Sequence, residues 1–318
     1  MRTIATLAVL AACSSGSAPT ESKPAPTTTP SAPPTATKPA PTTLEQLISA
    51  DTIGVVRQPG DQLIVMRYVH DLFVGLSGTE AAPACITDLE QRVKAGYQMS
   101  LGLGSAYFVL ETDAPQADVA SCFASATREE ITGEQEGELF AFHSRIGVAY
   151  TAWRAPYVVI GNRAQVEAAL HTNTKDIATR WRGFLAPAAA APTWMVRIDR
   201  SLDDLVGEHT TDYVFVLDKL EPPPRSLFAG RFIVHYASAA DADAAERHMR
   251  GWIARGKFPR RIEGAPAVAK LYDDIAAALQ KATIKRTPTA IEIGFDSQLF
   301  GGLDNLAKVM EAVGNVVK

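Results

Sequence analysis

The sequence predicts an α+β fold made of two similar tandem halves, each an antiparallel sheet with helices packed on one face, behind a disordered N-terminal tether. Two observations on the body predict this class. Short stretches alternate between apolar and polar residues, which is typical of half-buried strands, and other stretches repeat apolar residues every three or four positions, which is typical of helices. The order of these elements also recurs, and separate runs of strands and helices favour an α+β arrangement.

The chain begins with the features of a secretory signal. Arg2 supplies a positive charge, and Ile4–Ala12 is an apolar run too short to span a bilayer. The residues Leu10-Ala11-Ala12-Cys13 resemble the lipobox of bacterial lipoproteins. That resemblance implies cleavage after residues 1–12, thioether lipidation of Cys13 and acylation of the new amino terminus. The alternative is a plain signal peptide in which the cysteine is coincidental.

Residues 13–43 are predicted to form the lipidated cysteine and a disordered linker. Positions 14–43 contain eight Pro, eight Thr and five Ser, so they cannot bury enough apolar surface to offset the entropy of ordering. A proline-rich chain extends by about 3.1 Å per residue, so this tether reaches up to roughly 90 Å. An O-glycosylated stalk is the alternative. The mature second residue is Ser14 rather than Asp, which in the enterobacterial sorting pattern implies the outer membrane, with the body facing the periplasm or the surface.

The folded body is predicted from residue 44 onward, as one half at 44–185 and a second at 186–318. Alternation predicts nine strands: Leu63–Tyr68, Ala106–Glu111, Leu139–His143, Gly147–Trp153, Tyr157–Ile160, Thr193–Ile198, Asp212–Asp218, Arg231–Tyr236 and Thr289–Phe295. Helical spacing predicts helices within 86–93, 166–170, 245–253, 268–279 and 303–317, with Trp252 on the buried side of its helix.

Two stretches in the body resemble each other. Ala106–Glu111 leads into a segment with alanine and aspartate at 114, 117, 118 and 120, and Arg231–Tyr236 leads into the same residue types 125 positions later. Asp113 and Ser238 each stand where a helix N-cap belongs, with a polar residue three positions on. We interpret this as an internal repeat that divides in the Ala186–Pro192 stretch, the alternative being convergence.

Two cysteines remain once Cys13 carries lipid. In an oxidising compartment Cys85 and Cys122 are predicted to form a disulfide, which closes a loop of about 38 residues and contributes roughly 4 kcal/mol in the chain-entropy model. Two buried free thiols are the alternative.

The sequence contains no catalytic motif, no cofactor-binding loop and no metal-ligand spacing that we recognise. Nucleophile-elbow, zinc-protease, dinucleotide-binding and phosphate-loop patterns are missing, and the six histidines are not spaced as metal ligands. The net charge of −4 argues against a nucleic-acid partner. The acids Asp199, Asp203, Asp204 and Glu208 could hold a cation, but a helix capped by Ser201 with Asp204 completing a capping box explains them better.

One basic cluster stands out in this acidic body, and its functional interpretation is an anion-binding patch for lipid headgroups or an acidic polymer. The alternative is a helix C-terminus with cations that complement its dipole, followed by a solvated loop. The cluster comprises Arg247, Arg250, Arg255, Lys257, Arg260 and Arg261.

These observations predict a lipid-anchored lipoprotein of the bacterial cell envelope with a non-enzymatic binding or scaffolding role. Its expected partners are the membrane, through the N-terminal lipid, and an envelope protein, a lipid or an acidic polymer. The first alternative is a periplasmic carrier of a lipid or other apolar ligand. The second is an envelope hydrolase of unfamiliar family, whose polar groups would converge from His143, His235 and the acids near Asp203.

Overall fold

The structure is a computed structural model, and it describes residues 42–60, 84–102, 105–118, 121–122, 131–144, 147–200, 202–220, 228–256, 276–277 and 279–296. The residues predicted to form the lipobox and almost all of the predicted tether lie outside these residues. So do the predicted strand at 63–68, the predicted helix at 303–317 and most of the predicted helix at 268–279.

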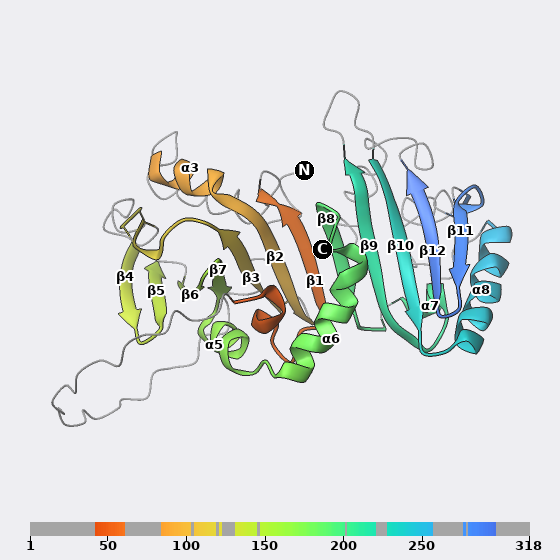
Figure 1. The fold of residues 1–318 in the computed structure, drawn as a ribbon, viewed down its shortest axis with the longest axis horizontal. Helices are drawn as coiled ribbons and strands as arrows, with labels where there is room; N and C mark the ends of the chain where they lie inside the picture. Colours follow the sequence, from red (N-terminus) through yellow and green to blue (C-terminus); the bar gives the residue numbers. More distant parts are fainter. Residues whose placement is uncertain are drawn as a thin grey trace.

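The described strands form one antiparallel sheet of twelve strands in the order β11-β12-β10-β9-β8-β1-β2-β3-β7-β6-β5-β4 (Figure 1). The predicted α+β class is confirmed, and the sheets of the two halves are joined edge to edge through β1 and β8. The strands are β1 (Gly54–Pro59), β2 (Val93–Gly102), β3 (Ser105–Thr112), β4 (Ile131–Glu136), β5 (Leu139–Ser144), β6 (Gly147–Arg154), β7 (Tyr157–Gly161), β8 (Thr193–Arg197), β9 (Thr210–Leu220), β10 (Phe228–Tyr236), β11 (Thr283–Thr287) and β12 (Ala290–Asp296).

One short helix precedes β1, and the other described helices connect later strands along the chain. The helices are η1 (Leu44–Leu47), α3 (Ala84–Gln91), α5 (Arg163–His171), α6 (Lys175–Leu185), η3 (Ala186–Ala188), α7 (Asp203–Val206) and α8 (Ala239–Ala254). Ser238 caps α8 as predicted, because its hydroxyl accepts a hydrogen bond from the Asp241 amide at 3.2 Å. The predicted cap at Ser201 is wrong, since α7 begins at Asp203 and the N-cap position falls on Leu202.

The two halves are related by an approximate twofold arrangement about the centre of the sheet. Val55 pairs with Val196 across β1 and β8, and Arg57 pairs with Trp194. A twofold rotation that places Val55 on Trp194 and Arg57 on Val196 therefore converts each pair into the other. Antiparallel neighbours related in this way have a twofold axis perpendicular to the sheet. Equivalent residues of the two halves therefore lie on the same face.

The outer hairpins repeat in full register. In the first half Tyr150 pairs with Gly161, and 133 residues later Thr283 pairs with Gly294. Both hairpins turn through two residues, at 155–156 and 288–289. Each hairpin then pairs through its second strand with the strand that precedes the helical segment, β7 with β3 and β12 with β10. The β4–β5 hairpin lies beyond this repeated unit and adds two strands at one end of the sheet.

Even the irregularities of the sheet recur. The ladder between β2 and β3 shifts register near Gly102 and again near Val93, and the ladder between β9 and β10 shifts near Gly230 and near Tyr236. These positions coincide when β2 is matched to β9 at a spacing of 117 and β3 to β10 at 124. The sequence offset between β3 and β10 is thus one residue shorter than the 125 inferred from the alanine pattern. With these offsets the two halves have the same hydrogen-bond register.

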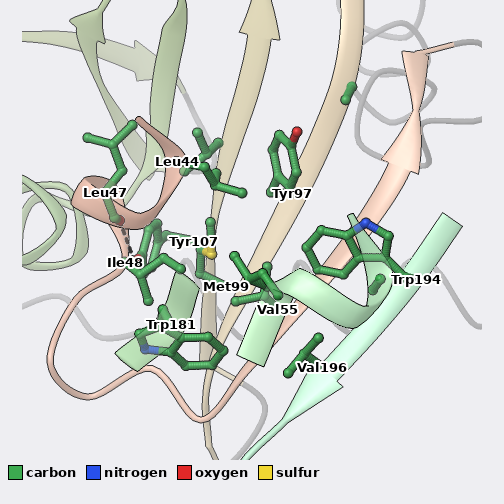
Figure 2. Packing of buried hydrophobic residues seen from close by; sticks show 14 of the residues in the cluster. Leu44, Leu47, Ile48, Val55, Tyr97, Met99, Tyr107, Trp181, Trp194 and Val196 are labelled. Atoms are coloured by element: carbon green, nitrogen blue, oxygen red, sulfur yellow. Dashed lines mark hydrogen bonds between the residues drawn. The ribbon is translucent and has the colours of Figure 1, made fainter. Parts of the chain in front are cut away.

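The helices α5 and α6 of the first half and the helix α8 of the second half cover opposite faces of the sheet. On one face α5, α6 and η1 bury a core that includes Val55, Met99, Tyr107, Trp181 and Val196 (Figure 2). On the other face α8 buries a second core, which includes Tyr213, Val234, Met249 and Trp252. Neighbouring residues of β9 show the alternation, since Tyr213 belongs to the α8 core and Val214 to the α6 core.

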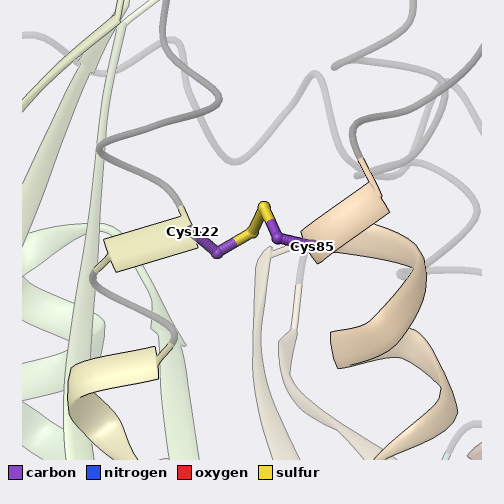
Figure 3. The surroundings of a disulfide bond; sticks show 2 residues. All are labelled: Cys85 and Cys122. Carbon is purple, nitrogen blue, oxygen red and sulfur yellow. A yellow bond between two sulfur atoms is a disulfide. The ribbon is translucent and has the colours of Figure 1, made fainter.

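Trp252 is 3% exposed, so its predicted place in the core is confirmed, and its indole N–H donates to the Leu205 carbonyl at 2.9 Å. The predicted disulfide also forms. Cys85 in α3 bonds to Cys122, with 5.5 Å between their Cα atoms, and ties α3 to the segment that follows β3 (Figure 3).

Candidate functional site

The point where the Pro/Thr/Ser-rich segment joins the body is a fixed structure. The backbone N–H of Thr43 donates to the Gln46 side-chain oxygen at 2.9 Å, and this contact closes the first turn of η1. Leu44 and Leu47 are buried against the sheet, at 8% and 2% exposure. The chain is therefore packed against the sheet within one turn of the end of the Pro/Thr/Ser-rich segment.

Two side chains from other elements hold this junction in place. The Tyr107 hydroxyl on β3 accepts from the Ser49 amide and donates to the Leu47 carbonyl, both at 2.8 Å, and burial raises the pKa of Tyr107. The Asn173 amide, between α5 and α6, donates to the Glu45 carbonyl at 2.7 Å and to the Ile48 carbonyl at 2.5 Å. The junction thus bonds to the sheet on one side and to the α5–α6 connection on the other.

The helix α6 packs beside this junction and exposes positive charge. Its N-cap hydroxyl, Thr174, accepts from the Ile177 amide at 3.3 Å, and Ala178, Trp181 and Leu185 form its buried side. The three cations of α6 are all exposed, and a single acid accompanies them, so the helix has a net charge of +2. The cations are Lys175, Arg180 and Arg182, and the acid is Asp176.

A groove of about 420 Å³ runs between η1 and α6. Its lining combines two ammonium or guanidinium groups with amide and hydroxyl groups that can bond an oxyanion. We call this groove and the exposed cations of α6 the α6 surface. The groove is lined by Gln46, Leu170, Asn173, Thr174, Lys175, Ala178, Thr179 and Arg182.

The basic cluster predicted from sequence lies elsewhere, and only half of it can be described. Arg247, Arg250 and Arg255 are exposed on or next to α8, while Lys257, Arg260 and Arg261 lie outside the described residues. Acids of α8 accompany the described cations. Glu246 accepts from Arg250 at 2.8 Å, and Asp243 pairs with Arg286 of β11 at 2.8 Å. The described surface of α8 is therefore close to neutral.

The residues proposed for a hydrolase do not converge. His143 lies on β5 and His235 on β10, eight positions apart in the strand order, which corresponds to roughly 40 Å at the usual strand spacing. His235 pairs with the buried Asp212 at 2.6 Å. Within the described parts of the chain, no group of three or more His, Cys, Asp or Glu side chains could hold a metal ion.

The acidic cluster near position 203 serves the fold. The Asp199 carboxylate accepts from Arg197 at 3.0 and 2.5 Å and from the Tyr213 hydroxyl at 2.7 Å, and this hydrogen bonding raises the pKa of Arg197. Asp203 accepts from the Thr210 hydroxyl at 2.9 Å, which ties α7 to β9. These contacts support the structural interpretation of the cluster over a cation site.

The comparisons with known proteins do not assign this chain to a family. No family model and no curated protein matches the chain. This chain is similar to solved structures of TP0453 in crystal forms III and I, with sequence identities of 11% and 10% and TM-scores of 0.44 and 0.45. Each alignment covers 86% of this chain and 98% of the TP0453 chain. At this distance the likeness carries no information about function. Among the helices that the structure describes, none is long and apolar enough to cross a membrane.

Proposed function

We propose that this protein is a lipid-anchored lipoprotein of the bacterial cell envelope whose body binds or scaffolds a partner without catalysing a reaction. The observation that carries the proposal is the junction at residues 43–49. A segment composed mostly of Pro, Thr and Ser ends there in a turn that bonds to the sheet and to the α5–α6 connection. A load applied to the tether is thus transmitted directly to the central sheet.

A binding role agrees with how the described ionisable groups are used. Asp199, Asp212 and Glu138 each accept a hydrogen bond from a cationic or histidine side chain, and Arg154 lowers the pKa of the Glu138 carboxyl. The pair of His235 on β10 with Asp212 on β9 links neighbouring strands. Catalysis instead needs an acid, a base or a nucleophile gathered around one reacting atom.

The lipid anchor is tested by metabolic labelling. The full chain is expressed with its own N-terminus in a bacterium supplied with labelled palmitate, beside the variant Cys13→Ser. We expect the wild type to incorporate label and sediment with membranes, and the variant to carry no label. Separation of inner from outer membranes then tests the proposed outer-membrane location.

The matched control is the double variant Cys85→Ser/Cys122→Ser, which removes the other two cysteines and should keep its label. Label that persists in Cys13→Ser, or a wild type without label, would show that the lipobox resemblance is misleading.

A further inference from the structure

We propose that the α6 surface lies against the anionic surface of the membrane that holds the tether, with its groove occupied by phosphate-bearing lipid headgroups. The inference rests on the proposed function, because the tether must bring the body to a membrane. It goes further in naming the face of the body that meets the bilayer and the lipids it selects.

Charge is the first argument. From residue 44 onward the chain has 28 basic and 34 acidic residues, so the body as a whole is repelled by an anionic bilayer. The helix α6 departs from this balance with three exposed cations against Asp176. The neighbouring acid Glu45 is half-buried, on η1. A cationic surface on an acidic body orients that body toward anionic lipid.

Position is the second argument. The tether ends at Thr43, and Gln46, three residues later, lines the same groove as Lys175 and Arg182. The chain that leads to the anchor and the cations that attract the headgroups therefore meet on one side of the body. The helix α8 is on the other face of the sheet, so a short excursion of the tether presents α6 to the bilayer before α8.

The chemistry of the groove is the third argument. Lys175 and Arg182 are about two helical turns apart on the groove side of α6, and Thr174 and Thr179 line the same groove. Cationic groups and hydroxyls are the usual ligands of phosphate oxygens. On the opposite flank of α6, Arg180 covers the half-buried Phe184 ring at 5.3 Å, which adds an aromatic group at interfacial height.

The test compares two sets of charge removals in the full chain. All proteins carry Cys13→Ser, so that no covalent lipid contributes to binding. One variant adds Lys175→Gln, Arg180→Gln and Arg182→Gln, and its matched control adds Arg247→Gln, Arg250→Gln and Arg255→Gln on α8. Each protein is sedimented with vesicles of phosphatidylcholine containing phosphatidylglycerol, and with vesicles of phosphatidylcholine alone.

We expect the α6 variant to lose affinity for the anionic vesicles by about tenfold or more, since each basic side chain near the surface contributes separately to the attraction. The α8 control should bind like its parent. Added salt should weaken the parent and leave the α6 variant little changed. Asp176→Asn, which removes the one acid of α6, should bind more tightly than the parent.

Equal binding by the α6 variant and its parent would overturn the proposal. So would equal loss in the α8 control, equal binding to both kinds of vesicle, or binding to soluble polyglutamate without binding to vesicles. Failure here is distinguishable from failure of the anchor, because palmitate labelling depends on Cys13 and the vesicle assay is performed without it. Matching circular dichroism spectra establish that the compared proteins are folded.

Discussion

Val56 of β1 lies directly opposite Met195 of β8, and the hydrogen-bond registers of the two halves are arranged symmetrically about this pair. The pair sits at the middle of the sheet, where the only strand-to-strand ladder between the described halves is formed. The next pair along this ladder, Val55 and Val196, is fully buried in one shared core under α6. The halves are therefore joined by both backbone bonds and apolar packing.

The first prediction is that the two halves unfold together. Val55→Ala and Val196→Ala each leave a cavity in the shared core and should cost about 2 kcal/mol, while the whole body still unfolds in one transition. Urea titration followed by circular dichroism and by tryptophan fluorescence checks this. Val148→Ala, at an exposed position, should change stability by less than about 0.5 kcal/mol. Two separated transitions in the wild type would contradict a shared core.

The second prediction concerns Gly230 on β10. A Cβ atom there would lie 2.3 Å from the Val216 carbonyl oxygen and 2.6 Å from the Phe295 ring, which stacks on Phe215 at 5.0 Å. Gly230→Ala should therefore destabilise the protein by about 1–3 kcal/mol, measured by thermal or urea unfolding.

The first half supplies the comparison for Gly230. Its equivalent position holds Ala106, and Gln98 and Asn162 stand where the second half has the two stacked rings. Ala106→Gly should cost no more than about 1 kcal/mol, the backbone penalty of glycine. A Gly230→Ala protein as stable as the wild type would show that the strand can shift to admit a methyl group.

The third prediction concerns the disulfide. Replacing Cys85 and Cys122 together by serine reopens a loop of about 38 residues and should lower the free energy of unfolding by roughly 4 kcal/mol at most. The Arg92 side chain bonds to Asp113 and Asp118 at 3.0 and 3.2 Å in the same region, and these exposed pairs compensate for little of the loss. Urea unfolding with and without reductant measures the difference. A wild type insensitive to reductant would mean that the bond adds no stability.

The fourth prediction concerns alkaline pH. Burial raises the pKa of Tyr157 to about 12 and raises the pKa of Tyr107, Tyr97 and Tyr236 as well. Above about pH 10 these phenols ionise in the unfolded chain while they stay protonated in the folded one. Stability should therefore be unaffected below pH 10 and should fall as the pH rises above it.

The tyrosinate absorbance tests this directly, because native protein should show part of its eight tyrosines titrating late and denatured protein should show all of them near pH 10. Tyr107→Phe should lose part of the alkaline sensitivity. It should also cost about 1–3 kcal/mol at neutral pH, since the Ser49 amide and the Leu47 carbonyl would lose their partner. Identical native and denatured titrations would contradict the burial of these rings.

The sequence predicted eight of the described strands because one face of each is apolar and the other polar. It missed β1, where burial is confined to the first two residues, Gly54 and Val55. It also missed β2, where Ala95, Gly96 and Tyr97 are buried in succession and no alternation appears. It missed β4 and β11, which are mostly polar edge strands. The repeat was visible in a few alanines, whereas the matching register shifts involve backbone pairing that no residue pattern encodes.

The candidate site was missed for a similar reason. The spacing of Ile177, Trp181 and Leu185 and the Thr174 cap could have indicated α6, and its cations are plain in the sequence. Their meaning depends on η1, which lies more than a hundred residues earlier and reaches α6 only through the fold. The sequence instead predicted an anion-binding patch in the denser cluster at 247–261. A cluster of cations along the chain does not show that acids of α8, such as Glu246, lie beside them on the helix surface.

The extra β4–β5 hairpin gives the sheet two chemically opposite ends. Among the described strands the sheet ends at β4, which carries Glu134 and Glu136, and at β11, which carries Lys285 and Arg286. A second copy added through the same edge would have to place its strand beside these like charges and beside the ion pairs of Glu136 with Arg163 and of Arg286 with Asp243, which opposes symmetric strand addition. The two ends of the sheet therefore differ in charge although the two halves are nearly equivalent, and each end disfavours pairing with the same end of a second copy.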